Sequence, residues 1–403
     1  MNTGNHRRWG DSGLRRKLTV GAAVLTSCLV LAACGSSAVP PPTTSSSVTT
    51  STSSASASSS SLSAIVSAAE KVPQYSAPGP AVSASAMKGK SVLVFPINNE
   101  IDACNAQADD FAALAKELGM NVTNFHDSGV PTEWVSAIQD ATSAHDAAVV
   151  MLCGVIPGAV GPQLTAAHKA GLKVVDGNYN ETTNYSGLDG ETAVDVAGGM
   201  RDDVADALLQ LHGKALHALM VTSSSVIQGP AAEAAVKSAV SSLCTSGCSV
   251  DATVNVPVQN WATSTQGDVS SALLAHPDIN AVFVAFDGMA AFAQAAIEQA
   301  HRPGLKLYSW GGGRSVEKLM EVKNPIIAAD PGPDEMWDAY EAMDQVIRLV
   351  TGHASASVAK ELDPNRFWVP SNVSQFFGPG GTYGNEGYGK FVAGFDHLWG
   401  VKG

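Results

Sequence analysis

The sequence lacks the short motifs that carry common enzyme chemistry. Gly-x-Ser-x-Gly and His-Glu-x-x-His do not occur in it. The range Gly311–Arg314 has the glycines of a phosphate loop, but Lys and Ser or Thr are absent at the required spacing. His212 and His217 are off the i, i+4 spacing of metal ligands on a helix. The sequence therefore predicts a protein that is not an enzyme and needs neither a metal nor a cofactor.

Basic residues are scarce as well. The chain has 24 Lys and Arg against 37 Asp and Glu, which gives a formal net charge of −13. Residues 88–403 contain no basic stripe, and nucleic acid is bound largely through Lys and Arg. The composition therefore argues against a nucleic-acid partner and suits an extracytoplasmic protein.

A long apolar run is also absent. The apolar stretch Leu18–Leu31 is too short for a transmembrane helix, which needs about 20 residues, and it has the length of a signal-peptide core. Five basic residues precede it: Arg7, Arg8, Arg15, Arg16 and Lys17. We expect residues 1–33 to be a signal peptide that is removed. The net charge then changes from −13 to −17, because these five residues and Asp11 leave together.

The end of this segment resembles the lipobox of bacterial lipoproteins. Small residues precede Cys34, in Leu31-Ala32-Ala33-Cys34, and Gly35 follows it. We expect Cys34 to be lipidated and to anchor the chain on the extracytoplasmic face of the cell membrane, since two acyl chains suffice for stable attachment. The alternatives are an ordinary signal peptide with an incidental cysteine and an uncleaved anchor helix.

Residues 34–87 are rich in Ser, Thr, Ala and Pro and contain few large apolar side chains. Such a segment buries too little apolar surface to offset its ordering entropy. We expect a disordered tether with an end-to-end distance of about 40 Å. Short helical character is compatible with residues 62–72.

The cysteines fit an oxidising compartment. Of the six, Cys28 leaves with the signal and Cys34 is the lipidation site. Four remain, an even number that favours disulfides: Cys104, Cys153, Cys244 and Cys248. Cys244 and Cys248 flank a short turn that a local disulfide could close. The competing zinc site is disfavoured, because a second matching pair is absent.

From residue 88 onward, short apolar runs alternate with amphipathic helices, which is typical of βα units. The expected strands are 91–96, 121–125, 147–152, 173–176, 218–222, 250–256, 281–285, 306–310 and 325–329. The expected helices are 105–118, 132–143, 161–170, 192–211, 230–243, 264–276, 288–299 and 335–351. This order predicts an α/β fold with doubly wound parallel sheets.

Several motifs resemble the sugar-binding type I periplasmic binding proteins, the ribose-binding-like branch that serves ABC importers. The run 94–99 is similar to the family's first strand and the Asn-rich loop after it. The run 171–176 resembles its Gly-Ile-Pro-Val-hydrophobic-Asp strand, and 195–199 resembles its Asp-Asn-x-x-Gly-Gly crossing. The run 276–290 matches best, and the similarity extends from about residue 90 to 351.

The resemblance implies two similar lobes joined by a hinge, with a ligand cleft at the carboxyl ends of the strands. We expect one lobe at residues 88–194 and 327–358 and the other at 195–326. Residues 359–403 would complete the hinge and form a C-terminal extension. Closure of the lobes on a ligand would then be recognised by the importer.

Twelve residues are expected to contact the ligand on this map. They are Asn98, Asn99, Asp102, Asp176, Asn178, Tyr179, Asp195, Gln228, Trp261, Asp287, Trp310 and Asp330.

Some of these residues have an alternative role. Asp287 would accept hydroxyl hydrogen bonds, or it would cap the helix that follows. Trp261 would stack on the apolar face of a sugar, or it would pack between the lobes or in a core. Asn98 and Asn99 suit vicinal hydroxyls and are also common in turns. Trp310, like Trp337, belongs to the cleft or to the core.

The sequence departs from the family pattern at several of these positions. An Arg is missing after Asp176, Gln228 stands where an Arg is common, and Asp330 stands near the position of a usual Gln. Asp195 takes an Asn position, where a carboxylate also suits a helix N-terminus. These departures predict an acceptor-rich cleft without Arg, which favours a neutral polyhydroxylated or an amine-bearing ligand over a sugar phosphate.

The fold also implies the cysteine pairing. The first and third strands of a doubly wound lobe are neighbours, so Cys104 is expected to pair with Cys153, and Cys244 with Cys248. Each pair should have its Cα atoms within about 4.4–6.8 Å.

The sequence thus predicts a monomeric, lipid-anchored solute-binding protein that captures a sugar or polyol for ABC transporter permease subunits. The alternatives are a ligand-sensing lipoprotein that partners a membrane signalling protein, and a receptor for a nucleoside, an amine or an aromatic ligand.

Overall fold

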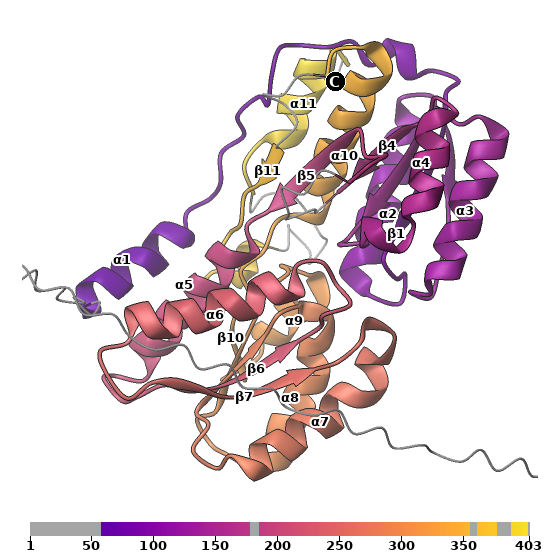
Figure 1. Ribbon diagram of the computed structural model, residues 1–403. Coiled ribbons are helices and arrows are strands. Elements are labelled where there is room, and N and C mark those ends of the chain that lie inside the picture. Colours follow the sequence, from indigo (N-terminus) through magenta and orange to yellow (C-terminus); the bar gives the residue numbers. More distant parts are fainter. Residues whose placement is uncertain (1–57, 178–184, 355–360, 377–387, 402–403) are drawn as a thin grey trace, which may run out of the picture. The chain divides into compact units, whose positions relative to one another are not determined.

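Two parallel sheets form the framework of the fold (Figure 1). The structure is a computed structural model, and it describes residues 58–177, 185–354, 361–376 and 388–401. The first sheet has the spatial order β11 (Glu361–Asp363), β5 (Gly190–Val194), β4 (Lys173–Asp176), β3 (Ala148–Leu152), β1 (Ser91–Pro96) and β2 (Asn121–Asn124). The second has the order β10 (Ile327–Ala329), β9 (Lys306–Ser309), β8 (Ala281–Val284), β6 (His217–Thr222) and β7 (Ser249–Asn255).

Helices cover both faces of each sheet. On the first sheet, one face packs against α2 (Asp102–Glu117) and α10 (Glu335–Thr351), and the other against α3 (Pro131–Ala144) and α4 (Gly161–Lys169). On the second sheet, one face packs against α5 (Val196–Gln210) and α6 (Gly229–Leu243), and the other against α7 (Trp261–Ala275) and α8 (Ala290–Ala300). We call each sheet with its helices a lobe. Three further helices are α1 (Ser59–Ala69), α9 (Arg314–Met320) beside β10, and α11 (Phe391–Trp399) on α10.

Burial on both faces explains the apolar strands. All residues of β3 and of β8 are buried, and every pairing between the named strands is parallel. Parallel strands between two helix layers need apolar side chains on both faces. The predicted doubly wound α/β architecture is therefore confirmed.

The structure corrects three local predictions. The predicted helix 192–211 begins later, because residues 192–194 belong to strand β5. Its start is set by Asp195, whose Oδ1 accepts a hydrogen bond of 2.8 Å from the Gly198 N–H. The short strand β11, which lies beside β5, was not predicted. Strand β10 pairs with β9, so residues 327–329 extend the second sheet rather than the first lobe.

Residues 58–87 are not the disordered tether that the composition predicts. Leu62 and Val66 of α1 are buried, and α1 packs against α5 of the second lobe. The Phe367 N–H then donates a hydrogen bond of 3.0 Å to the Ala69 carbonyl. Leu62 and Val66, together with the partly buried Ile65 and Ala69, thus hold a short Ser-rich helix against a partner surface.

The same segment continues onto the first lobe. The ring of Tyr75 lies 5.0 Å from that of Phe395 on α11, and the Val82 N–H donates a hydrogen bond of 2.9 Å to the Leu398 carbonyl. Residues 58–87 therefore contact both lobes, as the indigo trace in Figure 1 shows. Cys34 and the predicted signal peptide lie outside the described residues. None of the helices in the described ranges has the length and apolar character needed to cross a membrane.

Both predicted disulfides are present. The Cα atoms are 5.4 Å apart for Cys104 and Cys153 and 6.2 Å apart for Cys244 and Cys248. Cys153 follows β3 with a positive φ of 59°, a conformation that disfavours side chains other than Gly. The first disulfide therefore fixes a strained turn at the end of a central strand.

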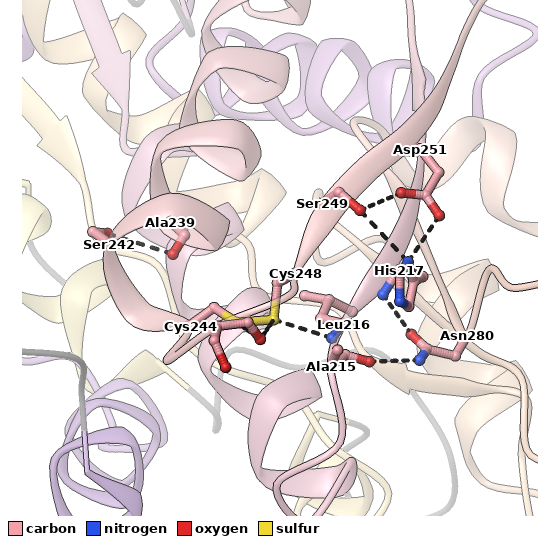
Figure 2. Close-up of a disulfide and its surroundings, with 11 residues drawn as sticks. Ala215, Leu216, His217, Ala239, Ser242, Cys244, Cys248, Ser249, Asp251 and Asn280 are labelled. Atoms are coloured by element: carbon pink, nitrogen blue, oxygen red, sulfur yellow. Dashed lines mark hydrogen bonds and ion pairs between the residues drawn. A yellow bond between two sulfur atoms is a disulfide. The ribbon is translucent and has the colours of Figure 1, made fainter.

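The second disulfide ties the end of α6 to the start of β7 (Figure 2). The Leu216 N–H donates a hydrogen bond of 3.1 Å to Cys248 Sγ. Nearby, His217 Nδ1 lies 3.0 Å from Asp251 Oδ2, and its backbone N–H donates to Asn280 Oδ1 at 2.9 Å. The disulfide thus belongs to a polar network at the amino ends of the strands, away from their carboxyl ends.

The two disulfides are expected to differ in their contribution to stability. They close loops with sequence separations of 49 and 4 residues. Loop-closure entropy predicts that Cys104→Ala with Cys153→Ala costs about 4 kcal/mol, and Cys244→Ala with Cys248→Ala about 2 kcal/mol. Urea denaturation of both double variants measures this. Equal losses, or a larger loss for the second pair, would contradict the entropic argument.

Candidate functional site

A cavity lies between the lobes, where the carboxyl ends of both sheets come together. Its accessible volume is about 50 Å³. Its walls are formed by Ile97, Ile101, Ala103, Cys104, Gln107, Cys153, Val226, Gln228, Trp261, Phe286, Asp287, Trp310, Gly311, Pro333 and Glu335. Gly154 marks a contact of the lobes, because a Cβ on it would overlap with Gln228 Oε1.

The first lobe contributes one face of α2 and the end of β3. Cys104 and Gln107 lie one turn apart on α2, and the disulfide to Cys153 forms part of the wall. Gln107 Nε2 donates a hydrogen bond to Asp338 Oδ2 on α10. The disulfide and this bond therefore hold the α2 wall in place.

The second lobe contributes an aromatic wall. The rings of Trp261 and Phe286 are stacked with centroids 5.5 Å apart, and Trp310 meets Phe286 edge-on at 6.5 Å. Trp261 Nε1 donates a hydrogen bond of 3.1 Å to the Val256 carbonyl. Trp310 is also buried, yet its Nε1 has no hydrogen-bond partner among the described residues. The wall thus offers apolar ring faces together with one unused donor.

Asp287 places a carboxylate beside this wall. It follows β8, its backbone N–H donates a hydrogen bond of 2.8 Å to the Trp310 carbonyl, and its side chain is 8% exposed. Burial raises the pKa of Asp287 to about 6; hydrogen bonds from the Gly288 and Gly313 N–H groups lower it, and the Asp102 charge raises it. Oδ2 makes no hydrogen bond of ordinary geometry with a described residue. The carboxylate is therefore desolvated and incompletely paired.

Two further buried acids, Asp330 and Glu317, lie within electrostatic reach of Asp287. Asp330 Oδ1 accepts a hydrogen bond of 2.7 Å from Ser309 Oγ, and its Oδ2 accepts one of 3.1 Å from the Gly312 N–H. Burial, and then the Asp287 charge, raise the pKa of Asp330 to about 8. Burial and the Asp330 charge also raise the pKa of Glu317 well above its usual range. Buried carboxyl groups thus cluster around Asp287.

Four of the twelve predicted ligand contacts line the cavity. They are Gln228, Trp261, Asp287 and Trp310. Asp287 is the first residue of the 3₁₀ turn η4 (Asp287–Met289), and it is not the cap of α8, which is Met289. The positions of these four fit the predicted role, and their contact with a ligand stays a prediction.

Other predicted residues stabilise loops or helix ends instead of lining the cavity. Asn98 Oδ1 accepts a hydrogen bond of 2.8 Å from the Glu100 N–H, and Asn99 Oδ1 accepts one of 2.8 Å from the Asp127 N–H. These hydrogen bonds agree with the alternative in which both asparagines stabilise turns. Asp195 caps α5, and Asp102 lines a neighbouring recess.

The remaining predictions fall in two groups. Asp176 and Asp330 are fully buried and do not line the cavity, and burial raises the pKa of Asp176 well above its usual range. Asn178 and Tyr179 lie outside the described residues. Trp337, which had a core alternative, is a core residue: its ring stacks on Phe391 at 4.6 Å.

Three functional candidates were missed from the sequence: Gln107, Phe286 and Glu335. Gln107 lies three residues after Cys104, so the helical period combined with the predicted disulfide could have found it. Phe286 directly precedes the predicted Asp287. Glu335 gave no comparable signal, because its position depends on how the chain returns from the second sheet to α10. No cluster of the described residues has the His, Cys, Asp and Glu set of a metal site.

Comparison with known proteins adds the fold assignment. No family model matches this chain, and no curated protein matches its sequence. Solved structures with two lobes of this topology do match. The chain has the type I periplasmic binding protein fold.

Three matches illustrate this likeness. An ABC transporter solute-binding protein from Agrobacterium vitis with bound allitol matches with a TM-score of 0.62 at 17% identity, over 72% of this chain and 98% of the other. A sugar ABC transporter protein from Yersinia enterocolitica gives 0.65 at 16%, over 82% and 100%. A solute-binding protein from Mycobacterium smegmatis with bound glycerol gives 0.63 at 18%, over 73% and 99%.

We predict that Asp287→Asn stabilises the ligand-free protein at neutral pH. The folded-state pKa of Asp287 is raised from 3.8 to about 6. The folded protein therefore binds more protons than the unfolded chain in this interval, and the carboxylate lowers stability as pH rises through it. We expect the variant to be more stable by about 1–3 kcal/mol at pH 7.5, with the difference vanishing near pH 4. Urea denaturation at both pH values checks this, and a loss of stability at pH 7.5 would contradict it.

Proposed function

We propose that this chain is a lipid-anchored, extracytoplasmic binding protein that captures a small sugar or polyol and delivers it to the permease subunits of an ABC importer. The observation that carries the proposal is the buried cavity between the lobes, with three aromatic rings on one wall and polar groups at Gln107, Gln228 and Asp287. A polyol needs this combination, because its C–H face packs on rings while its hydroxyls need hydrogen-bond partners.

Binding without chemistry fits the composition of the wall. Among the described residues that line the cavity there is no Ser, Thr, Lys or His that could act as nucleophile or base, and the two cysteines are joined in a disulfide. The proteins with bound allitol and glycerol provide the analogy for the ligand class. The analogy for transport comes from their descriptions as ABC transporter solute-binding proteins.

The anchor is the second part of the proposal. The Leu31–Cys34 run and the basic residues before Leu18 support a signal that ends in lipidation at Cys34. A membrane-attached receptor stays close to its permease, which raises the effective concentration of the loaded form.

We expect sugars or polyols to raise the melting temperature of the full chain in mild detergent. A ligand at a hundred times its dissociation constant adds about 2.7 kcal/mol of stability. Trp261→Ala and Asp287→Ala should each abolish the shift, because one removes a ring face and the other the buried acceptor. Leu274→Ala is the matched control, since Leu274 lies on the same helix as Trp261 and is 86% exposed. If no sugar or polyol shifts the melt, or if both site variants retain the shift, the proposal is wrong.

A further inference from the structure

The cavity between the lobes has a one-sided charge. Asp287 supplies a carboxylate, its side chain is 8% exposed, and none of the described lining residues is Lys, Arg or His. Glu335 also lines the cavity, and it shares a neighbouring recess with Arg314. Asp330 and Glu317 are buried within electrostatic reach of Asp287, and their raised pKa values show that further negative charge is unfavourable there. A desolvated carboxylate is stabilised most by a cation that enters the same space.

Three buried polar atoms of the cavity lining make no hydrogen bond of ordinary geometry with a described residue. Gln107 Oε1 and Asp287 Oδ2 are acceptors, and Trp310 Nε1 is a donor. Buried polar groups are normally satisfied, so unsatisfied acceptors and a donor on one small cavity indicate what the ligand must bring. The ligand must offer donors to the carboxylate and to the Gln107 amide oxygen, and one acceptor oxygen to the indole.

The aromatic wall favours a positive charge on that donor. Trp261, Phe286 and Trp310 all line the cavity, and the faces of such rings attract ammonium groups. A charge-assisted hydrogen bond to a carboxylate is roughly twice as strong as one from a neutral hydroxyl. A neutral polyol would satisfy the hydrogen bonds and leave the buried charge uncompensated.

We infer that the cavity is selective for a small hydroxylated amine, such as an amino polyol, whose ammonium binds Asp287 between aromatic rings and whose hydroxyl oxygen accepts from Trp310 Nε1. This inference rests on the proposed binding function and specifies its ligand class. The indole selects against plain alkylamines because they have no oxygen to accept its hydrogen bond.

The test compares two matched pairs by titration calorimetry on the full chain in mild detergent at pH 7.5. Glycerol is compared with 2-amino-1,3-propanediol, and sorbitol with 1-amino-1-deoxysorbitol; each pair differs only in one hydroxyl replaced by an ammonium. We expect the amine to bind at least about tenfold more tightly in at least one pair. Asp287→Asn should remove this preference and weaken the neutral partner by less than about threefold.

Two variants show whether the amine preference depends on groups inside the cavity or on charge outside it. Asp102→Asn removes one negative charge that acts on Asp287 from outside the cavity, and it should leave the amine preference within about twofold. Trp310→Phe keeps a ring and removes the donor, so it should weaken 2-amino-1,3-propanediol several-fold and leave ethylamine binding unchanged. The second variant keeps the test informative if Asp287→Asn does not fold.

The outcomes distinguish the two proposals. Equal affinity within both pairs, or tighter binding of the neutral partners, overturns the amine inference and leaves sugar or polyol capture in place. An amine preference that survives Asp287→Asn shows that the ammonium binds elsewhere, which also overturns the inference. If neither the amines nor any neutral sugar or polyol binds, both proposals are wrong.

Discussion

The parallel pairing of the strands determines where the cavity lies. Because every named strand in a sheet runs in the same direction, the segments that follow the strands leave from one edge. In the first lobe these segments deliver Ile97 and Cys153, and in the second they deliver Gln228, Asp287 and Trp310. Residues far apart in the sequence therefore meet in one cavity without any direct sequence signal that links them.

Acidic groups are buried near that edge. Asp287, Asp330 and Glu317 are all buried, and burial raises the pKa of each. Such a cluster lowers the stability of the ligand-free protein, because the charged form of each group is desolvated. The backbone also packs closely on Asp287, because a Cβ at Gly313 would overlap with its carboxylate.

The segment 58–87 adds a contact that the two-lobe plan alone does not require. It joins α5 of the second lobe to α11 of the first through Phe367, Tyr75 and Val82. The amino-acid composition predicted disorder for this segment, because a Ser-rich helix has little intrinsic tendency to fold. Its order depends on packing against the surface of α5. The local sequence does not indicate the surface against which such a segment packs.

Prediction from the sequence succeeded where a local pattern decides the outcome. The strands at 91–96 and 173–176 were predicted with the bounds of the structure, since their apolar runs lie between two helix layers. The disulfide of Cys104 followed from the neighbouring positions of the first and third strands. Trp261, Asp287 and Trp310, which the family resemblance placed at the cleft, line the cavity, and their contact with a ligand stays a prediction.

The failures have a common physical cause. Asn98, Asn99 and Asp195 were predicted at the cleft, but their side chains form local hydrogen bonds with nearby backbone. Polar side chains at strand ends serve turns and caps as readily as ligands, and only tertiary placement decides between the two. Glu335 was missed because no local pattern indicates its position. The path of the chain back to α10 brings it to the cavity.

The proposed function implies that the two lobes close on a ligand that enters the cavity. Spin labels on Thr132→Cys and Ala262→Cys test this directly, because both residues are exposed and each lies in the first turn of the helix that follows an edge strand of its own lobe. With the sugar, polyol or amine that binds most tightly, we expect lobe closure to give a shorter and narrower distance distribution between the labels. An unchanged distribution at saturating ligand would contradict it.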